Sequence, residues 1–516
     1  MTQQQDSVGL REICSGGRPP RGFLENLETL CIKRCASMSC LFPSWMLIQS
    51  LRKLKEVNIR WCGELEDVFQ LEGLSYAKEN PFLLSSLESL HLDWFRKSEV
   101  YMEGSHPASL EQELAFPSLK VLDLDGLKKL ECLCKGPTHL LSLPKLKELS
   151  LWRCDRLRHM FSPSLARNFM QLEKLIIDDC GKLEQIFIED DAAEYNQTLS
   201  KDHLQCQGLT HLFSSTTLVR NLLRLESIDI EACRELEQII VEDHTEDDHV
   251  QLGLFPNLSS ISINGCGKLK SMFPVNIAHF LSLQNLTTLK LYYCHGLTHL
   301  FSSTLARNLL QLESIDIWQC RELEQIIVED HPEDDQVQLG LFPNLSSISI
   351  KGCGKLKTLF PAVTTARSGL QKLDHTEDDH VQLGLFPNLS SISVTDCDKL
   401  KTLFPFNITQ LGLQKLKTLN VVSSSQLEEL FEHKDEADTT SDREMVLPQL
   451  ENLTLQQLAS LVNFCPIGYH FIFPSSSELL VTKCPKLTTR FSINQNRPVH
   501  AEAKVLTNVD VVVDKR

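Results

Sequence analysis

Apolar residues recur along most of this chain in a fixed pattern of sixteen positions. The clearest copy is LESIDIEACRELEQII at 225–240: a leucine, apolar residues three and five positions later, a cysteine at eight, and apolar residues at eleven, fourteen and fifteen. The first three of these positions predict a short strand, about four residues long, with one buried face. Later apolar residues such as Leu236 and Ile239 do not continue this alternation, so we expect a return segment over the same core.

Copies of the pattern follow one another along the chain, mostly 26 to 34 residues apart. Clear copies start at Leu27, Leu54, Leu146, Leu172, Leu225, Leu258, Leu286, Leu312, Leu345 and Leu389, and weaker copies at Leu87, Leu119, Leu416, Leu450 and Ser476. One such unit cannot offset a backbone entropy cost of roughly 1–2 kcal/mol per ordered residue, so neighbouring units must stack into a continuous core.

We therefore expect one elongated solenoid of about 15–16 repeats over residues 27–491. A partial, uncapped repeat is expected at 1–26, and a tail or last strand at 492–516, where VLTNVDVVV (505–513) fits either state. The segment LQCQGLTHLF at 204–213 keeps only the second half of a repeat, and we interpret it as damaged. The phrase FSSTLARN at 301–308 predicts the start of a short helical return with a serine as its N-cap.

The spacing matches the leucine-rich-repeat template with cysteine at its last position. The continuations CGKLKSMFP at 266–274 and CDKLKTLFP at 397–405 resemble the repeats of plant intracellular nucleotide-binding leucine-rich-repeat disease-resistance proteins of the coiled-coil type, over about 10–491. This resemblance implies an α/β fold, a curved horseshoe with short parallel strands on the concave face and loops and short helices on the convex face. It also implies a cytoplasmic protein-binding module in plant defence that recognises pathogen effectors or host proteins. In a full-length receptor, such repeats restrain the nucleotide-binding switch.

Cysteine usage points to a reduced compartment. Eleven of the 18 cysteines hold the same repeat position, at residues 35, 62, 154, 180, 233, 266, 294, 320, 353, 397 and 484. Side chains that point the same way from neighbouring strands have poor geometry for disulfides, so we expect free, buried thiols. The N-terminus has no apolar signal segment, no stretch is long enough to span a bilayer, and the sequons, several of them copies of FPNLSSIS, are expected to be unused.

Other functional classes find little support in the residues. A net charge of −17 argues against a non-specific nucleic-acid binder. The GK pairs lie in repeat turns and lack the phosphate-loop spacing, so we expect neither a cofactor nor the nucleotide-binding domain of the family. The acidic loops DHTEDDH at 243–249 and 374–380 match no known metal spacing, and we interpret them as solvated. No catalytic constellation stands out, and we expect no enzyme activity.

Residues between the buried strand positions are expected to line the concave face, where they vary between repeats. Large aromatic residues occur there six or seven positions after the starting residue, and such residues are typical anchors of protein interfaces. We therefore predict a protein-binding site on this face at Trp61, Trp94, Trp152, Tyr292, Tyr293 and Trp318. The alternative is that these rings pack sideways on their neighbours.

Charge along the same strip is graded along the chain. Basic residues come first, at Lys33, Arg34, Lys55, Arg60, Lys147 and Arg153, and acidic residues follow, at Asp178, Asp179, Asp229, Glu231 and Asp316. Such a surface would orient a partner of complementary polarity, and the alternative is ordinary surface charge. The other functions left open are a substrate-recruiting repeat protein of a ubiquitin ligase, a non-functional fragment of a resistance gene, and a secreted or cell-surface repeat receptor.

Overall fold

The computed structural model describes the chain in sections. These are residues 22, 24–38, 40–42, 51–65, 67–69, 84–95, 114–130, 141–161, 170–183, 185–187, 208–213, 219, 222–240, 253–273, 281–328, 342–360, 386–404, 413–432, 443–465, 469–493 and 499–502. The chain forms two compact units, Met1–Leu258 and Ser259–Arg516, and each is described by itself.

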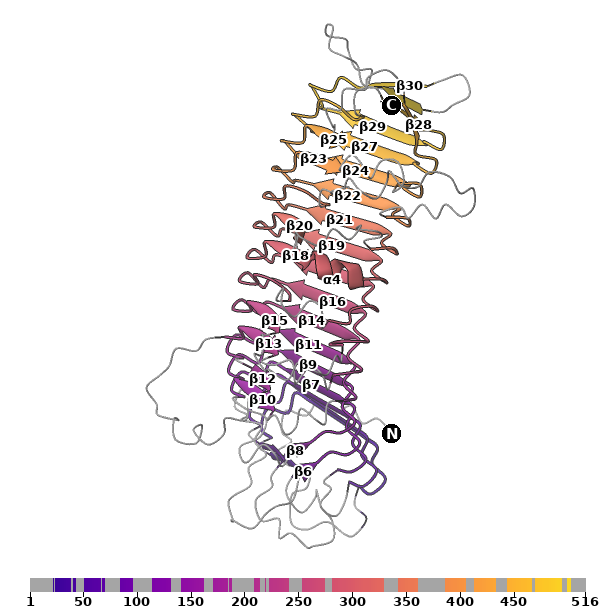
Figure 1. Cartoon of the computed structure of the whole chain (residues 1–516). Helices are drawn as coiled ribbons and strands as arrows, with labels where there is room; N and C mark the ends of the chain where they lie inside the picture. Colours follow the sequence, from indigo (N-terminus) through magenta and orange to yellow (C-terminus); the bar gives the residue numbers. More distant parts are fainter. Residues whose placement is uncertain are drawn as a thin grey trace, which may run out of the picture. The chain divides into compact units, whose positions relative to one another are not determined.

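In the first unit the principal element is a parallel sheet, which we call the main sheet of that unit (Figure 1). Its strands lie side by side in chain order: β1 (Thr29–Lys33), β3 (Glu56–Arg60), β5 (Ser89–Asp93), β7 (Val121–Asp125), β9 (Glu148–Trp152), β11 (Lys174–Asp178) and β14 (Ser227–Glu231). Because each strand pairs with that of the next coil, every coil of the chain contributes one strand and then returns, as a solenoid requires.

The second unit has a main sheet of the same kind, again parallel and in chain order. Its strands are β16 (Ser260–Asn264), β17 (Thr288–Tyr292), β19 (Ser314–Trp318), β21 (Ser347–Lys351), β22 (Ser391–Thr395), β24 (Thr418–Val422), β27 (Asn452–Gln456) and β29 (Glu478–Thr482). Every copy of the pattern predicted from the sequence, clear or weak, is followed two residues later by one of these main strands.

The main strands are five residues long, one more than the pattern predicts. In all but the first and last of them, β1 and β29, the second and fourth residues are buried, as Ile315 and Ile317 are in β19. The first, third and fifth residues lie toward solvent, except that the third is buried in β9 and β11. Burying each such side chain contributes about 1.5–3 kcal/mol, which is the main source of cohesion between coils. The apolar pattern of the strand ends at its fourth residue. The fifth residue belongs to the strand because its backbone pairs with that of the next coil.

A left-handed residue follows each main strand, with φ between 49° and 72°. Its N–H donates to the carbonyl of the last strand residue in the next coil, as in the 2.8 Å bond from Tyr293 to Trp318. Such a conformation costs a non-glycine residue roughly 1–2 kcal/mol, against a contribution of about 0.5–1.5 kcal/mol from one hydrogen bond. The turn brings the chain to the buried cysteine that comes next and leaves the left-handed side chain at the edge of the sheet.

The described repeat cysteines are buried, and none of them forms a disulfide. Cys320, for example, donates through Sγ to the carbonyl of Leu291 in the preceding coil, at 3.6 Å. Burial raises the pKa of Cys62 to about 11 and that of Cys397 to about 12, so these thiols stay protonated and unreactive. Ser424 replaces the cysteine in one repeat and accepts a hydrogen bond from the Cys397 N–H.

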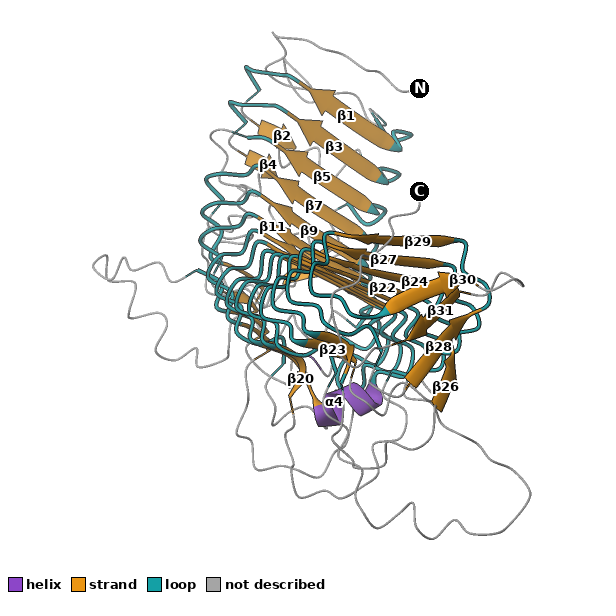
Figure 2. Ribbon diagram, turned by 90° about the horizontal axis from the view of Figure 1, so that it is seen from above, coloured by secondary structure: helices purple, strands orange, loops and turns teal. Residues whose placement is uncertain are grey.

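The return segments contain short paired strands as well as loops (Figure 2). These pairs are β2 (Cys40–Phe42) with β4 (Asp67–Phe69), β6 (Leu114–Ala115) with β8 (Leu141–Ser142), β10 (His159–Phe161) with β12 (Gln185–Phe187), β13 (His211–Phe213) with β15 (Gln238–Ile240), β18 (His299–Ser302) with β20 (Gln325–Val328), and β23 (Thr402–Phe404) with β25 (Glu429–Phe431). The sequence predicts only loops and short helices there. Isoleucine and phenylalanine in these segments favour extended pairing, which explains the difference.

The predicted helical return is confirmed as α4 (Ser303–Asn308), where the Ser302 hydroxyl accepts a hydrogen bond from the Leu305 N–H at 3.2 Å. The damaged repeat also behaves as expected. It contributes the return strand β13, while β11 pairs directly with β14, Lys174 lying opposite Ser227. The main sheet of the first unit therefore continues from β11 to β14 without a strand from the damaged repeat.

Phenylalanines form a column inside the return side of the second unit: Phe360 and Phe404 of the Leu-Phe-Pro phrase, and Phe431, which is followed by glutamate instead of proline. The rings of Phe360 and Phe404 stack at 6.1 Å between centroids, and those of Phe404 and Phe431 at 4.9 Å. Aromatic pairs of this kind contribute about 0.5–1.5 kcal/mol beyond their buried area. The recurring phenylalanine therefore joins successive coils.

A separate sheet of four strands lies near the end of the described chain: β26 (Arg443–Val446), β28 (Tyr469–Phe473), β31 (Val499–Glu502) and β30 (Arg490–Ile493). Strand β31 runs antiparallel to both of its neighbours, unlike the strands of the repeats. The segment 505–513, considered above as a last strand, lies outside the described residues. Within the described residues, no helix is long and apolar enough to cross a membrane.

Candidate protein-binding site

We call the side of each main sheet that carries the first, third and fifth strand residues its open face. The six aromatic residues predicted as binding residues all lie there or at its edge. Trp152, Tyr292 and Trp318 are fifth strand residues, whereas Trp61, Trp94 and Tyr293 occupy the left-handed turn position. The exposed fraction is 47% for Trp61 and 40% for Trp318, so these rings remain accessible although they also touch neighbours.

In the second unit, three of these aromatic rings come together. Tyr292 on β17 lies in register with Trp318 on β19, and their ring centroids are 6.3 Å apart with planes at 80°. Tyr293 follows Tyr292 at the left-handed position, which directs its ring to within 5.6 Å of Trp318. We call Tyr292, Tyr293 and Trp318 the aromatic cluster. Its two more exposed members, Tyr293 and Trp318, are each about two-fifths exposed.

Two charged residues, Asp316 and Lys351, lie beside the aromatic cluster, and each contacts one of its members. The Tyr292 hydroxyl donates a 2.7 Å hydrogen bond to Oδ2 of Asp316, the third residue of β19. Burial, and then this hydrogen bond, raise the pKa of Tyr292 to about 12, so the phenol remains a donor at physiological pH. Nζ of Lys351 lies 5.4 Å from the centroid of the Trp318 ring, a cation–π contact.

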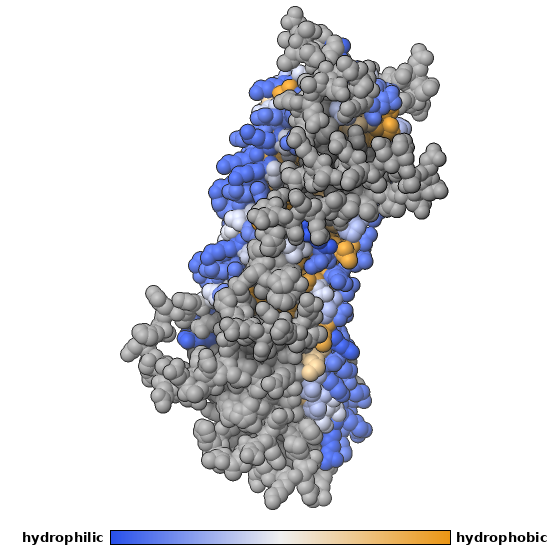
Figure 3. Space-filling model, in the orientation of Figure 1, coloured by the Kyte–Doolittle hydropathy of each residue, from blue (hydrophilic) through white to orange (hydrophobic). Residues whose placement is uncertain are grey.

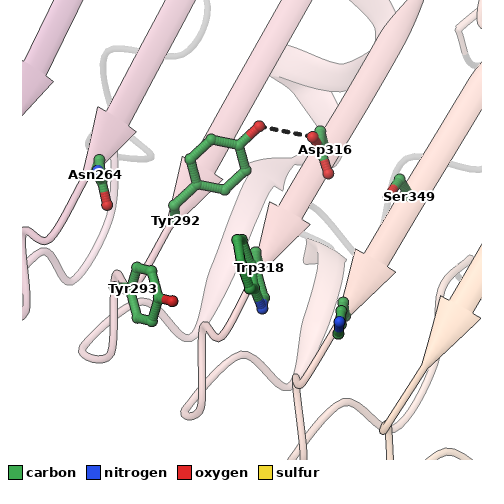
Figure 4. Close-up of a pocket in the computed structure, with 7 residues that line it drawn as sticks. Asn264, Tyr292, Tyr293, Asp316, Trp318 and Ser349 are labelled. Carbon is green, nitrogen blue, oxygen red and sulfur yellow. Dashed lines mark hydrogen bonds between the residues drawn. The ribbon is translucent and has the colours of Figure 1, made fainter.

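A hollow of about 440 Å³ opens over the aromatic cluster (Figure 4). The rest of its lining comes from three strands, β16, β19 and β21: Asn264, Asp316, Ser349 and Lys351. In the close-up, Tyr292 and Asp316 meet at one side of the hollow, and Trp318 lies between Tyr293 and the strand that carries Ser349. An apolar floor with a few convergent polar groups is the usual composition of a binding pocket.

In the first unit the described contacts of the Trp94 ring are with a glycine and with cations, although the ring is as exposed as that of Trp318. The Trp94 ring lies against Gly126, where an added Cβ would stand 3.1 Å from Cγ of the indole. The Arg153 guanidinium carbon lies 5.1 Å from the centre of the same ring, and Arg153 also pairs with Asp125, with Nη2 2.6 Å from Oδ2. Sideways packing, the alternative considered for these rings, thus accounts well for Trp94.

Trp61 and Trp152 do not join a cluster of described aromatic residues. The Arg34 guanidinium lies 5.2 Å from the centre of the Trp61 ring, so Trp61 has one cationic neighbour. Trp152 lies in register between Asp125 and Asp178, which gives it carboxylates on both sides. The structure therefore brings together only three of the six predicted residues.

Acidic residues crowd the open face of the first unit beside Trp152. Burial, and then the nearby carboxylates of Glu231 and Asp179, together raise the pKa of Asp178 to about 6. Burial and Asp125 similarly raise the pKa of Asp93. Arg153 also lies among these acids, where it pairs with Asp125. The graded charge along the face stays a prediction from the sequence.

Lys351 and Ser349 are lining residues that the sequence analysis does not identify. Both lie on β21, whose strand sequence, SISIK, contains no aromatic residue. The register between β19 and β21 identifies both residues, because Lys351 is opposite Trp318 and Ser349 is opposite Asp316. Aligning the fifth strand residues of consecutive copies would have placed Lys351 next to the predicted tryptophan.

The described residues contain no group of three or more histidine, cysteine, aspartate and glutamate side chains that could hold a metal ion. The two DHTEDDH loops lie outside those residues. In the view of Figure 3 the described surface is mainly hydrophilic, with small apolar patches. The hollow over the aromatic cluster offers groups for contact with a partner: aromatic area, a phenol, a carboxylate and an ammonium.

Comparisons with solved structures return other repeat proteins. One is the leucine-rich repeat domain of the type III effector XCV3220 (XopL), with 21% identity, a TM-score of 0.31, and coverage of 54% of this chain and 77% of that one. Another is the TLR13–ssRNA13 complex, with 14% identity, a TM-score of 0.18, and coverage of 89% and 82%.

Sequence comparisons give the family. A curated relative, "Probable disease resistance protein At4g19520" of Arabidopsis thaliana, is 25% identical over 296 residues, which is 49% of this chain but 16% of that protein. The family model of plant disease resistance protein RPS2-like leucine-rich repeats matches residues 2–99, 82–181, 202–321 and 370–500, well over half of the chain. Leucine-rich repeats of this kind are typically protein-interaction modules rather than enzymes. The chain is a leucine-rich-repeat solenoid and belongs to the family of plant disease resistance protein RPS2-like leucine-rich repeats.

Proposed function

We propose that this chain binds a protein through the open face of its second unit, with the aromatic cluster as the anchor. The observation that carries the proposal is the convergence of Tyr292, Tyr293 and Trp318 around one hollow, with rings two-fifths exposed at its rim. Large, stiff aromatic side chains bury much area on binding at little entropy cost, and they dominate the energy of protein interfaces.

The cluster is also rigid before any partner arrives. Tyr292 is fixed by Asp316, and Trp318 lies between Tyr293 and Lys351, so little side-chain freedom remains to be lost on binding. By contrast, Trp94 is as exposed as Trp318, at 40%, but the described contacts of its ring are with Gly126 and with the cations Arg153 and Lys128 rather than with another aromatic ring. We therefore assign Trp61, Trp94 and Trp152 supporting roles at most.

The family supports the class of partner. A disease-resistance repeat module of this kind would recognise a pathogen effector or a host protein, and in a longer receptor the repeats would restrain a nucleotide-binding domain. The described repeat cysteines form no disulfide, which supports a cytoplasmic location, because disulfides are rare in that compartment.

Site-specific photo-cross-linking in plant cells tests this proposal. A photo-reactive phenylalanine analogue at Ser349 lines the hollow and leaves the aromatic cluster intact, while the same analogue at the exposed turn residue Lys399 serves as the control. We expect a discrete protein adduct from position 349 that is absent from position 399 and is lost in the Trp318→Ala background. The proposal fails if position 349 gives no adduct, or if the adduct persists undiminished without the Trp318 ring.

A further inference from the structure

The open face of the second unit continues beyond the hollow as a row of uncharged side chains. They are the third and fifth residues of three consecutive strands: Ser393 and Thr395 on β22, Asn420 and Val422 on β24, and Thr454 and Gln456 on β27. We call these six residues the uncharged row. All are partly exposed, and the strands are in register, so the row forms a continuous band across the sheet.

The hydrogen-bonding groups of the row are held in place by their neighbours. Asn420 Nδ2 donates to Ser393 Oγ at 3.2 Å, one coil back along the row. At the edge, Ser423 Oγ donates to Gln457 Oε1 at 2.7 Å. Hydroxyl and amide groups of this kind donate and accept, and therefore suit the backbone of a peptide as well as uncharged side chains.

Two charged residues next to the row already have a contact, and Asp396 lies at its edge, at the exposed turn position after Thr395. Asp316 accepts the Tyr292 hydroxyl, and Lys351 lies on the Trp318 ring. Lys290 is opposite Asp316 on β17, across the hollow from the row. Over the six residues of the row, none of which is charged, a charged ligand side chain would lose hydration without gaining a partner, which costs free energy, whereas an uncharged one would not.

The length of this surface sets the length of its ligand. Trp318 on β19 and Thr454 on β27 are separated by four strand spacings, or roughly 19 Å at about 4.8 Å each. An extended chain rises about 3.3 Å per residue, so about six or seven residues span the distance. The hollow at one end has room for one large side chain.

We propose that the hollow and the uncharged row together bind one extended, uncharged peptide segment of a partner protein, about seven residues long, whose aromatic or large aliphatic side chain enters the hollow. This rests on the proposed function, because it specifies the chemistry of the partner at the same site. The segment runs across the strands, with its anchor on the aromatic cluster and its backbone along Ser393, Asn420 and Thr454.

Synthetic peptides test this specificity with the full chain. The probes are acetylated, amidated heptapeptides of Ser, Thr, Asn and Gln with Phe, Leu or Ala near one end, together with versions in which two polar residues become Lys or Glu. Fluorescence anisotropy should show that the Phe and Leu peptides bind at least about tenfold more tightly than the Ala peptide and than either charged version. Affinity should change less than about twofold between low and high salt, because no charge pair forms.

Two lysine substitutions provide the matched comparison. Asn420→Lys puts a charge in the middle of the row, and Ser262→Lys puts the same charge on the same face at β16, away from the row. We expect Asn420→Lys to weaken binding of the neutral Phe peptide at least about tenfold and Ser262→Lys to leave it within about twofold. Circular dichroism melting of both variants confirms that each is folded.

The outcomes separate the two proposals. Tighter binding of a charged peptide, a steep salt dependence, or an unchanged affinity in Asn420→Lys overturns the neutral-peptide assignment. If the Ser349 cross-link forms while no neutral peptide binds, protein binding stands and this assignment falls. If neither the cross-link nor peptide binding is observed, both proposals fall.

Discussion

The phenol of Tyr292 and the carboxylate of Asp316 are joined by a 2.7 Å hydrogen bond between neighbouring coils of the second unit. Asp316 is a third strand residue and Tyr292 a fifth strand residue, so the bond runs diagonally across two strands. It fixes the Tyr292 ring at the side of the hollow, and it engages a carboxylate that would otherwise attract a cation. One pair thus determines both the shape and the charge of the candidate site.

Replacing Asp316 by Asn should lower the pKa of Tyr292 from about 12 toward the ordinary value of 10. The negative charge of Asp316 disfavours a second anion, and its removal eases deprotonation of the phenol. Burial is the larger cause and persists, so the pKa should remain above 10. Ultraviolet titration of wild type and variant measures the difference, and an unchanged titration would show that Asp316 does not act on Tyr292.

The pKa of Asp178 makes stability depend on pH in a definite direction. It is raised from 3.8 to about 6 by burial and by Glu231 and Asp179, so the folded chain disfavours the ionised form. The resulting destabilisation is present above pH 6 and disappears as the pH falls from about 6 toward 4, where the unfolded chain also becomes protonated. Lowering the pH from 7 to 5 should therefore stabilise the first unit.

The variant Asp178→Asn removes this destabilisation at every pH. We expect its melting temperature at pH 7 to exceed that of the wild type, and the difference between the two proteins to shrink toward pH 4. Asp398→Asn, at an exposed turn, is the control. A variant that melts below the wild type at pH 7, when the control is unchanged, would contradict the cause given for the shift.

Two glycines at the left-handed turn should respond differently to substitution by alanine. Gly126 has φ 65°, and an added Cβ would lie 3.1–3.2 Å from rigid ring atoms of Trp94. Gly352 has φ 72°, and its added Cβ would meet the flexible end of the Gln319 side chain. Both variants incur a backbone cost of roughly 1–2 kcal/mol, but only Gly126→Ala also meets a ring that cannot move away.

Chemical denaturation should therefore show a greater loss of unfolding free energy for Gly126→Ala than for Gly352→Ala. Removing the ring in a Trp94→Ala background should reduce the cost of Gly126→Ala. Equal costs in the two backgrounds would mean that contact with Trp94 does not explain the glycine.

Ile348 is 3% exposed and packs between the coils, whereas its neighbour Ser347 lies toward solvent. Ile348→Asp buries an unpaired carboxylate and should cost several kcal/mol, about 3–5, while Ser347→Asp should cost less than about 1 kcal/mol. Because a solenoid is stabilised by contacts between neighbours, hydrogen exchange should rise mainly in β19, β21 and β22. Uniform exchange throughout the second unit would contradict this local picture.

The sequence predicts the fold well because each coil repeats the same constraint. Apolar residues at this fixed spacing are all buried when a short strand is followed by a turn. The structure shows this arrangement, in which Ile315, Ile317 and the following Cys320 are buried. The return strands are not predicted, because a segment of three residues such as QII is too short for its period to distinguish a strand from a loop.

The candidate site is predicted only in part. The aromatic residues are recognisable by type, but type alone does not distinguish Trp318, which borders a hollow, from Trp94, which packs on Gly126. That difference depends on which residue stands opposite in the next coil, a glycine for Trp94 and Lys351 for Trp318. Register across coils 30 or so residues apart is a property of the stacked structure rather than of one repeat.

The most direct test of the account measures the affinity of the purified chain for the protein cross-linked at Ser349. Isothermal titration compares the wild type with Trp318→Ala and with Trp94→Ala, the matched tryptophan of the first unit. We predict that Trp318→Ala weakens binding by about 2 kcal/mol or more, roughly thirtyfold, and that Trp94→Ala changes it by less than about 0.5 kcal/mol. Equal affinities of wild type and folded Trp318→Ala would contradict the claim that the aromatic cluster is the anchor.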